Sequence, residues 1–488
     1  MSDMSDLLTH DSFFIGNEFV APAGTDRIEV INPATEQLLG SCPAGTPADM
    51  DRAVAAAREA FDHGPWPQMS PTERADAIAR LSTALQGKAV EIADIITKEN
   101  GSPAAWSIMG QVFSSTMVLD AYVDITKNHD WVTERQGALS PVTVRKVPVG
   151  VCAGIIPWNV PLFISVLKLG PALAAGCTIV LKPAPDTPLD SYLLAEAVIE
   201  AEIPPGVVNI VAADRAPSEY LVRHPDVDKV SFTGSVAAGR KIGAICGEQL
   251  KPMTLELGGK SAAIILDDVD LDSVMGDLLG SGLMNNGQVC GAQSRLLISR
   301  SKYAEFVDAI GQAMAAMPVG DPLDPATAIG PLVNASQRDR VKGYQQLGVE
   351  EGAKVVTGGG QPDGPGYFIE PTLFADATND MRIAREEIFG PVLTAIPYDD
   401  EDDAVRIAND SDMGLCGSVW SSDVDHASDL AARVRTGVVT INSQMILDMK
   451  APFGGFKSSG IGRELGPEGI APNTELQPII TPSVAPTG

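Results

Sequence analysis

Between residues 150 and 268, short β-like runs alternate with stretches of helical pattern. The predicted strands cover 150–156, 178–182, 207–212, 229–233 and 261–267. Helical segments such as 189–201 and 235–247 lie between them. Strand–helix–strand alternation is typical of a parallel sheet joined by right-handed crossovers. The sequence therefore predicts an α/β fold.

A second α/β pattern follows from about residue 270 to 440. Its strand candidates are 295–299, 392–397, 417–420 and 437–441. Residues 46–97 have apolar and charged residues at helical spacing, and Pro47 and the run Ser70-Pro71-Thr72-Glu73 are typical helix starts. We expect surface helices there. A chain of 488 residues also exceeds one ordinary domain.

Two further β-like segments, 131–149 and 476–483, stand outside both patterns. If they pair, they form an arm that reaches a neighbouring subunit. The alternative is a plain hairpin at a sheet edge.

Composition excludes several classes of function. The net charge of −28 disfavours binding to phosphate backbones, so no nucleic-acid partner is expected. No apolar run of about 18 residues occurs, and the first residues lack a signal-peptide core, so we expect no membrane partner. The six cysteines are scattered, and the histidines are isolated. This pattern predicts a reducing cytoplasm and no metal site.

The run Asn285-Asn286-Gly287-Gln288-Val289-Cys290 surrounds one cysteine with polar residues and glycine. We expect an exposed thiol whose thiolate form nearby backbone amides or a helix start would favour. A thiolate can attack a carbonyl group. The alternative is that Cys290 is a small core residue.

Glu256 ends a strand-like run and begins Glu256-Leu257-Gly258-Gly259-Lys260. A carboxylate at a strand end can act as a general base on water. The alternative is a salt-bridged surface glutamate. Gly259-Lys260-Ser261 is similar to the end of a P-loop, but Thr254 stands where that motif needs glycine, so we exclude a nucleoside triphosphate site.

Two strand-to-helix turns carry weaker signals. Phe232-Thr233-Gly234-Ser235 offers glycine and a helix start, which suit a phosphate, but a purely structural turn fits as well. Asn159, in Ile156-Pro157-Trp158-Asn159, can donate to a developing oxyanion, or it can be an ordinary loop residue.

Together and in this order, these segments resemble the aldehyde dehydrogenase superfamily from about residue 12 to 480. The resemblance rests on seven motifs: IPWNVP, LKPAPDTP, FTGS, LELGGKS, NNGQVC, EEIFGPV and PFGGFKSSGIGRELG. It implies a dinucleotide-binding domain at 1–127 and 149–258, a catalytic domain at 259–445, and an oligomerisation arm at 128–148 and 474–488. It also implies a homodimer or homotetramer.

The resemblance implies a role for each matching residue. Cys290 matches the nucleophile, Glu256 the general base and Asn159 the oxyanion donor, while Lys168 and Glu464 match a proton-relay pair. Lys182 would hold the adenine ribose, Ser235 the pyrophosphate, and Glu387 and Phe389 the nicotinamide ribose. The remaining implied cofactor contacts are Ile156, Pro157, Trp158, Pro185, Gly234 and Leu257.

The implied reaction oxidises an aldehyde through a thioester on Cys290, which water then hydrolyses. The implied cofactor is NAD, with NADP possible. Many NAD-preferring members carry Glu where this chain has Pro185, which can neither accept from a ribose hydroxyl nor repel a 2′-phosphate. We favour NAD because this segment has no Arg to pair a phosphate.

The expected substrate pocket is apolar. Val160, Phe163, Ile164 and Leu167 share one helix face, and the loop 444–449 with Met445 and Leu447, together with Phe453, forms another wall. No Arg is evident that could bind a second carboxylate on the substrate, so we expect a medium-sized or bulky apolar aldehyde. The alternative is that this stripe is ordinary core.

Three competing functions fit parts of the sequence. A CoA-acylating dehydrogenase would use CoA in place of water, but such members often lack the general base. A non-catalytic protein of the same fold would have no need of Cys290, Glu256 and Asn159, which are all present. A thioesterase or esterase function of the same thiol is expected only as a side activity.

Overall fold

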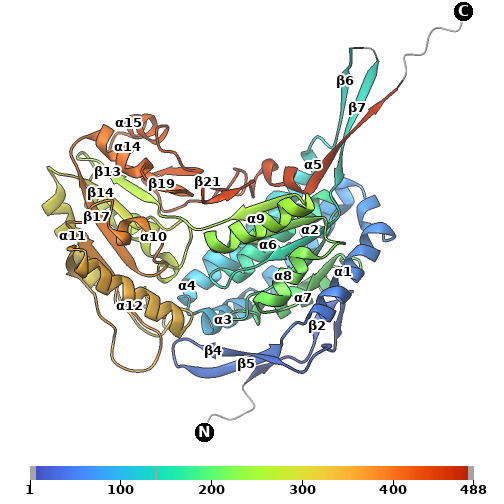
Figure 1. Cartoon of the computed structure of the whole chain (residues 1–488), viewed down its shortest axis with the longest axis horizontal. Coiled ribbons are helices and arrows are strands. Elements are labelled where there is room, and N and C mark those ends of the chain that lie inside the picture. The colour runs from blue at the N-terminus through green and yellow to red at the C-terminus, as the bar shows by residue number, and fades with distance from the viewer. Residues whose placement is uncertain (1–6, 139, 482–488) are drawn as a thin grey trace, which may run out of the picture.

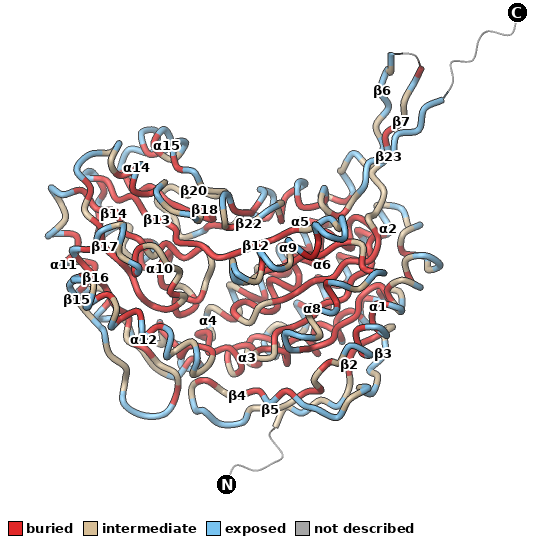
Figure 2. The backbone as a smooth tube through the Cα atoms, in the orientation of Figure 1, coloured by how far each residue is buried: buried red, intermediate tan, exposed pale blue. Residues whose placement is uncertain are grey.

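The computed structural model describes residues 7–138 and 140–481. Two large sheets with helices on their faces form the body, and a narrow arm projects from it (Figure 1). The strands of both sheets are mostly buried, whereas the arm is mostly half-buried or exposed (Figure 2). The predicted α/β class is confirmed.

The first sheet has eight strands. Its order is β22 (Gly460–Ile461), β12 (Met253–Glu256), β11 (Lys229–Thr233), β8 (Val151–Ile155), β9 (Thr178–Lys182), β10 (Val208–Ile210), β2 (Phe13–Ile15) and β3 (Glu18–Val20). Strands β12 to β10 are parallel. The strands predicted at 150–156, 178–182, 207–212 and 229–233 are therefore confirmed, two of them shorter than predicted.

The second sheet has seven strands. Its order is β15 (Lys354–Thr357), β16 (Thr372–Ala375), β17 (Val392–Tyr398), β14 (Arg295–Ser299), β13 (Ala262–Ile265), β19 (Cys416–Trp420) and β20 (Val438–Ile441). Only β15 is antiparallel to its neighbour. The run at 261–267 forms β13, but the expectation that it continues the first sheet is wrong. The chain crosses between the sheets at 257–261, and β13 pairs with β14 and β19.

Helices cover both sheets. Those associated with the first sheet are α1 (Pro47–Asp62), α2 (Pro71–Gly87), α3 (Ala89–Asn100), α5 (Ser114–Asn128), α6 (Pro161–Ala175), α7 (Asp190–Glu200), α8 (Arg215–Arg223) and α9 (Val236–Gln249). Those associated with the second are α10 (Leu271–Leu283), α11 (Tyr303–Ala315), α12 (Ala335–Glu350), α13 (Arg382–Arg385), α14 (Glu401–Asn409) and α15 (Val424–Ala431). Short helical turns are η2 (Trp66–Gln68), α4 (Ala104–Trp106), η3 (Ser107–Phe113), η4 (Met284–Gly287), η5 (Pro467–Gly469) and η6 (Ala471–Asn473).

The predicted helix starts are confirmed. Thr46 and Ser70 cap α1 and α2, and in both cases the third helical residue completes a capping box, while proline occupies the first turn. Among the described residues, no helix is long and apolar enough to cross a bilayer.

Three small sheets complete the fold: β1 (Leu8–Thr9) with β5 (Gln37–Pro43) and β4 (Arg27–Asn32); β18 (Met413–Gly414) with β21 (Phe456–Lys457); and β23 (Thr474–Ile480) with β7 (Pro141–Pro148) and β6 (Val132–Gln136). The last of these is the arm. The predicted pairing of 131–149 with the C-terminal segment is confirmed as far as residue 480, and residues 482–483 of that prediction lie outside the described residues.

Candidate active site

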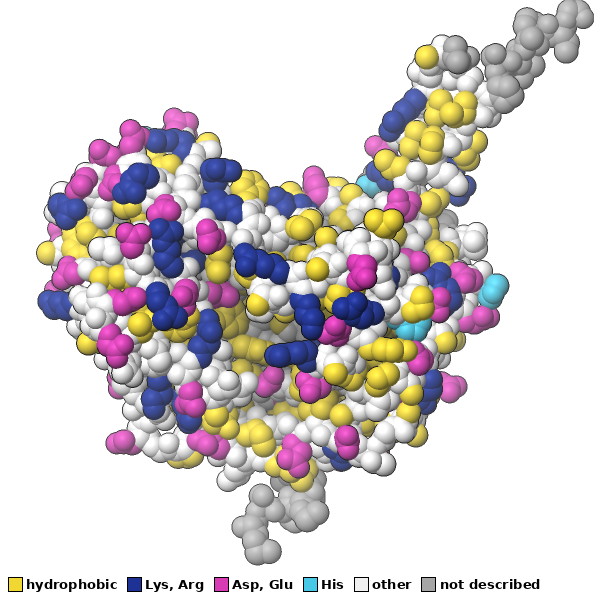
Figure 3. All heavy atoms as spheres, viewed as in Figure 1, with side chains coloured by type: hydrophobic (Ala, Val, Ile, Leu, Met, Phe, Trp, Pro, Cys, Tyr) yellow, Lys and Arg dark blue, Asp and Glu magenta, His cyan; other side chains and the backbone are white. Residues whose placement is uncertain are grey.

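A cavity of about 690 Å³ is lined by residues that belong to, or connect, the elements of both large sheets. The surface is hollowed between the two lobes of the body (Figure 3). Cys290 and Glu256 both line the cavity. It therefore brings the predicted nucleophile and the predicted base together.

The turn before Cys290 is built by Asn285, Asn286 and Gly287, which all have positive φ. Asparagine and glycine are the residues that adopt this conformation most readily. A Cβ at Gly287 would also meet the carbonyl of Gly390 at 2.2 Å. The Asn286 side chain donates to the carbonyls of Gly101 and Pro331, both at 2.9 Å, and accepts from the Gly330 N–H at 2.7 Å. The polar run before Cys290 is thus a buried brace for the loop that presents the thiol.

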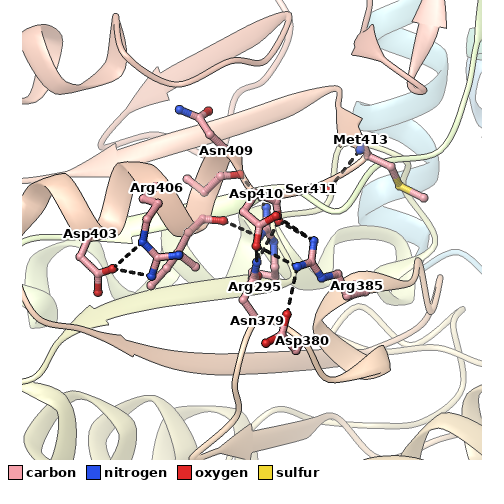
Figure 4. A network of polar contacts seen from close by, with 12 residues as sticks. Arg295, Asn379, Asp380, Arg385, Asp403, Arg406, Asn409, Asp410, Ser411 and Met413 are labelled. Atoms are coloured by element: carbon pink, nitrogen blue, oxygen red, sulfur yellow. Dashed lines mark hydrogen bonds and ion pairs between the residues drawn. The ribbon is translucent and has the colours of Figure 1, made fainter.

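The loop that follows Glu256 is held close to Cys290. A Cβ at Gly259 would lie 2.3 Å from the Cys290 carbonyl oxygen, so only glycine fits. Arg295, buried at the start of β14, donates to the Lys260 carbonyl at 2.9 Å and to the Ile407 and Ala408 carbonyls at 3.0 Å. Figure 4 shows Arg295 beside Asn379, Arg385 and Asp410; the Arg295 guanidinium donates to Asn379, and Asn379 and Arg385 both donate to Asp410. The network fixes the crossing between the sheets.

The environment of Cys290 departs from the prediction of an exposed, activated thiol. The residue is half-buried. Burial and then the carboxyls of Glu387 and Glu256 raise the pKa of its thiol to about 12, although backbone amides at Gly291 and Cys290 oppose them. The backbone amides lower the pKa of the thiol as expected, but burial raises that pKa by more. The resting thiol is therefore protonated near neutral pH.

Glu256 is the last residue of β12 and is buried, so the alternative of a salt-bridged surface glutamate is wrong. Neither carboxyl oxygen has a hydrogen-bond partner among the described residues. Burial and the Glu464 carboxyl raise its pKa well above the usual range, and Lys168 and Arg463 only partly oppose this. An unpartnered carboxyl of this kind can take up and return a proton near neutral pH.

Asn159 lies in the loop between β8 and α6, and it is buried beside the Cys290 loop. Its side-chain amide donates to the Gln288 carbonyl at 2.9 Å. Asn100 and Asn285 both donate to the Asn159 carbonyl, at 3.2 and 2.8 Å. One N–H of the Asn159 amide thus anchors the loop, and the second is left for another acceptor.

Lys168 and Glu464 form a buried ion pair, as the predicted relay requires. Lys168 also donates to the Thr233 hydroxyl at 2.5 Å. Because Glu464 contributes to the raised pKa of Glu256, the pair lies within electrostatic reach of that carboxyl.

The predicted cofactor residues divide into two groups. Pro157, Trp158, Gly234, Ser235, Leu257, Glu387 and Phe389 line the cavity, whereas Ile156, Lys182 and Pro185 do not. Lys182 ends β9, and burial lowers its pKa to about 8 while the carboxylates of Asp214 and Asp186 oppose this.

The cavity wall fits a dinucleotide. Ser235 caps α9, so the first turn of that helix presents N–H groups at the cavity. Glu387 accepts from the Gly259 N–H at 3.0 Å, and burial raises its pKa to about 7. A Cβ at Gly258 would lie 2.4 Å from this carboxyl. The rings of Trp158 and Phe389 meet edge to face at 5.3 Å.

All seven predicted substrate residues line the cavity: Val160, Phe163, Ile164, Leu167, Met445, Leu447 and Phe453. The four α6 residues are also buried members of the hydrophobic core, so the stripe serves both as core and as cavity wall. A further wall, which was not predicted from the sequence, comes from α4, η3 and α5 and is formed by Trp106, Met109, Phe113 and Met117. Met109, Phe113 and Met117 are 60%, 42% and 54% exposed. Their spacing of four residues was the available signal.

Comparison with known proteins supports one family. The sequence profile of the Aldehyde dehydrogenase family matches residues 19–479. A geranial dehydrogenase from Castellaniella defragrans is 48% identical over 95% of this chain and 97% of its own length.

Solved structures agree with that match. A Mycobacterium tuberculosis aldehyde dehydrogenase complexed with NAD+ is 46% identical, covers 98% of this chain and 99% of its own, and superposes with a TM-score of 0.96. A mutant of aldehyde dehydrogenase C from Pseudomonas syringae, complexed with NAD+ and octanal, is 38% identical, covers 99% of this chain and 98% of its own, and has a TM-score of 0.93. The chain belongs to the aldehyde dehydrogenase family and is an aldehyde-oxidising enzyme.

Proposed function

We propose that this enzyme oxidises medium-sized or bulky apolar aldehydes to carboxylic acids with NAD and water, through a thioester on Cys290. The observation that carries the proposal is the cavity itself. It holds a thiol, a carboxyl with no hydrogen-bond partner within residues 7–138 and 140–481, and an apolar wall, and its opposite side fits a dinucleotide.

The apolar class of substrate follows from the wall beyond Cys290. The charged residues that line the cavity are Glu256, Arg340 and Glu387. Arg340 donates to the Glu387 and Ile388 carbonyls, so it lies on the cofactor side. A second carboxylate on the substrate would therefore be desolvated without a partner among the described residues. The names of two relatives, a geranial dehydrogenase and an octanal complex, fit this class.

NAD is the proposed cofactor, and when bound it accepts a hydride. Glu387 would hold the nicotinamide ribose, Lys182 the adenine ribose, and Ser235 with the first turn of α9 the pyrophosphate. Pro185 carries no charge, but Asp186 and Asp214 place negative charge near Lys182. This charge would repel the 2′-phosphate of NADP. Two relatives are solved with NAD+.

The first chemical step requires a thiolate. Because the pKa values of Cys290 and Glu256 are both raised, the resting site holds a thiol, and its proton has to leave before attack. The proton passes to water in the cavity. The Cys290 sulfur then bonds to the aldehyde carbon, and the free N–H of Asn159 stabilises the oxyanion. Such a donor contributes about 3 kcal/mol in comparable sites. Loss of the hydride from that carbon leaves a thioester on Cys290.

The second chemical step needs water. The Glu256 carboxylate removes a proton from water, the hydroxide adds to the thioester, and the Cys290 sulfur leaves as a thiolate, which takes up a proton to restore the resting thiol. Lys168 and Glu464 move the proton away from Glu256. An unpartnered base beside the thiol favours water over CoA as the acceptor, and this supports hydrolysis against the acylating alternative.

We also propose that the protein is a homodimer or homotetramer joined through its arm. The arm strands carry exposed apolar residues, namely Val132, Leu476, Ile479 and Ile480. Exposed strands with apolar side chains are typical sites of pairing with another chain. Six free cysteines support a reducing, cytoplasmic setting.

The proposed division into domains follows the two sheets. The dinucleotide-binding domain covers 1–127 and 149–258, the catalytic domain 259–445, and the arm 128–148 and 474–488. Parallel strands at 151–256 and at 262–441 support the first two boundaries. Strand β22, from a segment that this division does not assign, adds an edge to the first sheet.

The proposal is tested by following the absorbance of reduced nicotinamide with octanal and with succinic semialdehyde. We expect NAD reduction with octanal, at least tenfold higher kcat/KM than with the semialdehyde, and no reduction by Cys290→Ala. Preference for the semialdehyde would contradict the apolar class. Full activity in Cys290→Ala would contradict the mechanism.

A further inference from the structure

The methionines of this chain are unevenly distributed. Five of the 15 line the active-site cavity, namely Met109, Met117, Met284, Met445 and Met449. Within residues 7–138 and 140–481, only three methionines are exposed, and all three belong to this group. They are Met109, Met117 and Met445, which are 60%, 54% and 67% exposed. We call these three side chains the cavity methionines.

Two stretches of chain contribute the cavity methionines. Met109 lies in η3 and Met117 in α5, and Phe113 stands midway between them, so that steps of four residues bring them to one side. Met445 lies in the loop after β20, where its backbone N–H donates to the Ser443 hydroxyl at 3.1 Å. All of them meet at the same cavity. The cavity methionines thus form a surface that contains several thioether groups.

Their exposure places the cavity methionines toward the open side of the cavity. By contrast, Glu256 is only 3% exposed and Cys290 is half-buried, so the reacting groups lie deeper. A short aldehyde bonded to Cys290 keeps its whole chain near these groups. A long aldehyde has further carbon atoms, which extend toward the cavity methionines.

The chemistry of methionine makes this surface changeable. The thioether side chain is flexible and apolar, and it packs well against varied apolar ligands. Oxidation adds one oxygen atom to the sulfur and turns the side chain into a polar sulfoxide, which methionine sulfoxide reductases convert back. Met50 and Met314 are buried in the core, so they are shielded from an oxidant that reaches the cavity methionines directly.

An organic hydroperoxide is the class of oxidant that fits this surface. Its alkyl chain is chemically similar to that of an apolar aldehyde, so the same apolar wall would bind both. The methionine sulfur bonds to the outer oxygen of the hydroperoxide, the O–O bond breaks, and the proton moves to the oxygen that leaves as the alcohol. The sulfur loses two electrons and the hydroperoxide gains them.

The resting state of Cys290 favours oxidation of methionine over oxidation of the nucleophile. The thiolate is the reactive form of cysteine, and burial raises the pKa of the Cys290 thiol to about 12. Little thiolate is therefore present near neutral pH. A thioether carries no proton and needs no ionisation before it reacts.

We propose that Met109, Met117 and Met445 are sites of reversible oxidation by organic hydroperoxides, and that their oxidation shifts the enzyme from long toward short aldehydes. This inference rests on the proposed function, because it assigns a regulated surface to the proposed substrate cavity. The modification leaves Cys290, Glu256 and Asn159 unchanged.

The shift follows from the polarity of the sulfoxide. A long apolar chain that covers a sulfoxide removes water from its oxygen without supplying a hydrogen bond, and it loses apolar contact with the thioether. A short aldehyde does not reach the cavity methionines and loses nothing. Oxidation therefore raises KM for a long substrate and leaves KM for a short one unchanged.

The first part of the test locates the added oxygen in the full-length enzyme. Cys290 is first blocked as a methyl disulfide with methyl methanethiosulfonate, the enzyme is treated with tert-butyl hydroperoxide, and dithiothreitol then frees the thiol without reducing a sulfoxide. We expect the peptides that contain Met109, Met117 and Met445 each to gain one oxygen atom, and those with the buried Met50 and Met314 to gain none. Oxidation of the buried pair before the cavity methionines would overturn the proposal.

The second part measures KM of the treated enzyme with NAD and either octanal or propanal. We expect KM for octanal to rise about fivefold, the effect of losing the apolar contact of roughly one methylene group, at unchanged KM for propanal. Methionine sulfoxide reductases A and B should restore the original KM. Oxidation of all three sites without a change in KM for octanal, or an equal change for both aldehydes, would overturn the proposed shift.

Two variants assign the effect, each compared with its own untreated form. Met109→Leu/Met117→Leu/Met445→Leu keeps an apolar surface but cannot take up oxygen, so the hydroperoxide should leave its KM for octanal unchanged. The matched control is Met275→Leu/Met317→Leu/Met381→Leu, at half-buried methionines outside the cavity, and it should respond as the unmodified enzyme does. An equal response of both variants would overturn the assignment.

A failure of the proposed function is distinguishable from a failure of this inference. If the untreated enzyme does not oxidise octanal, the proposed function fails. The peptide masses do not depend on activity or on any variant, and they still decide whether the cavity methionines are the sites that take up oxygen.

Discussion

Cys290 and Glu256 show how burial sets the resting state of the site. Both groups are more easily neutral than charged, because burial raises the pKa of each and the two carboxyls nearest Cys290 add to the effect. The thiol is therefore protonated at rest, and a protonated thiol reacts less readily with electrophiles other than the substrate. Proton transfer then becomes part of every turnover.

This resting state predicts how Cys290 reacts with iodoacetamide. Below a thiol pKa of about 12, the thiolate fraction grows about tenfold per pH unit, so the alkylation rate should rise continuously from pH 6 to 9. In Glu256→Gln the rate should be higher at those pH values where the Glu256 carboxyl is ionised in the unmodified enzyme, because the variant removes its repulsion of the thiolate. The readout is the mass of the peptide that contains Cys290, and the five buried cysteines serve as internal controls. A plateau at neutral pH would contradict the raised pKa.

Two acidic residues near Lys182 bear on the choice between NAD and NADP. Asp214, exposed at the start of α8, and Asp186 supply negative charge near Lys182. Removing a partly solvated charge near a phosphate changes binding by about 1 kcal/mol, or about fivefold. Asp214→Ala should therefore raise kcat/KM for NADP about fivefold and leave that for NAD nearly unchanged. Asp425→Ala, an exposed acid on α15, is the control. Equal gains in both variants would refute a local effect.

At the scale of elements, the regular strands were predictable and the irregular helices were not. β-like runs such as 178–182 and 229–233 mark buried strands, and Thr46 and Ser70 carry their cap signals locally. The π-helical turn η3 has no such signal; its Gly110 packs closely against the Trp106 ring, a contact that local sequence does not announce. The place of β13 in the second sheet also depends on tertiary structure, because the sequence of a strand does not determine which strands pair with it.

The same limit applies to the site. The motifs predicted Cys290, Glu256 and the face of α6, because each motif is a contiguous stretch. They did not predict that burial outweighs the backbone amides at Cys290, nor that Asp214 lies near Lys182, since both depend on which segments the fold brings together.

The wall formed by η3 and α5 predicts selectivity for chain length. Met109 and Met117 are exposed at the cavity, so their replacement by serine should not disturb the core. Burying one methylene group of a long substrate against such a wall contributes about 0.8 kcal/mol to binding. KM for octanal should therefore rise about fivefold in Met109→Ser/Met117→Ser, with KM for propanal unchanged. Val90→Ser, an exposed apolar residue on α3, is the control. Equal changes for both aldehydes would refute the assignment.

For the whole molecule, the arm is the feature that a single chain leaves unexplained. Its three strands extend from the body (Figure 1). Leu476 and Ile480 on these strands are exposed. Leu476→Lys/Ile480→Lys should shift the sedimentation coefficient toward that of a monomer, because charges on the pairing surface oppose association. The control is Leu250→Lys, an exposed apolar residue at the end of α9. An unchanged assembly in the arm variant would show that another surface joins the subunits.

The central claim is that the aldehyde carbon becomes bonded to Cys290 and that Glu256 releases it as the acid. The most direct measurement is the intact mass of Glu256→Gln after mixing with NAD and octanal. We predict one equivalent of reduced nicotinamide and a protein heavier by one octanoyl group, located on the peptide that contains Cys290, with Cys290→Ala as the unmodified control. Rapid acid formation without a detectable adduct, or an adduct on another residue, would contradict the account.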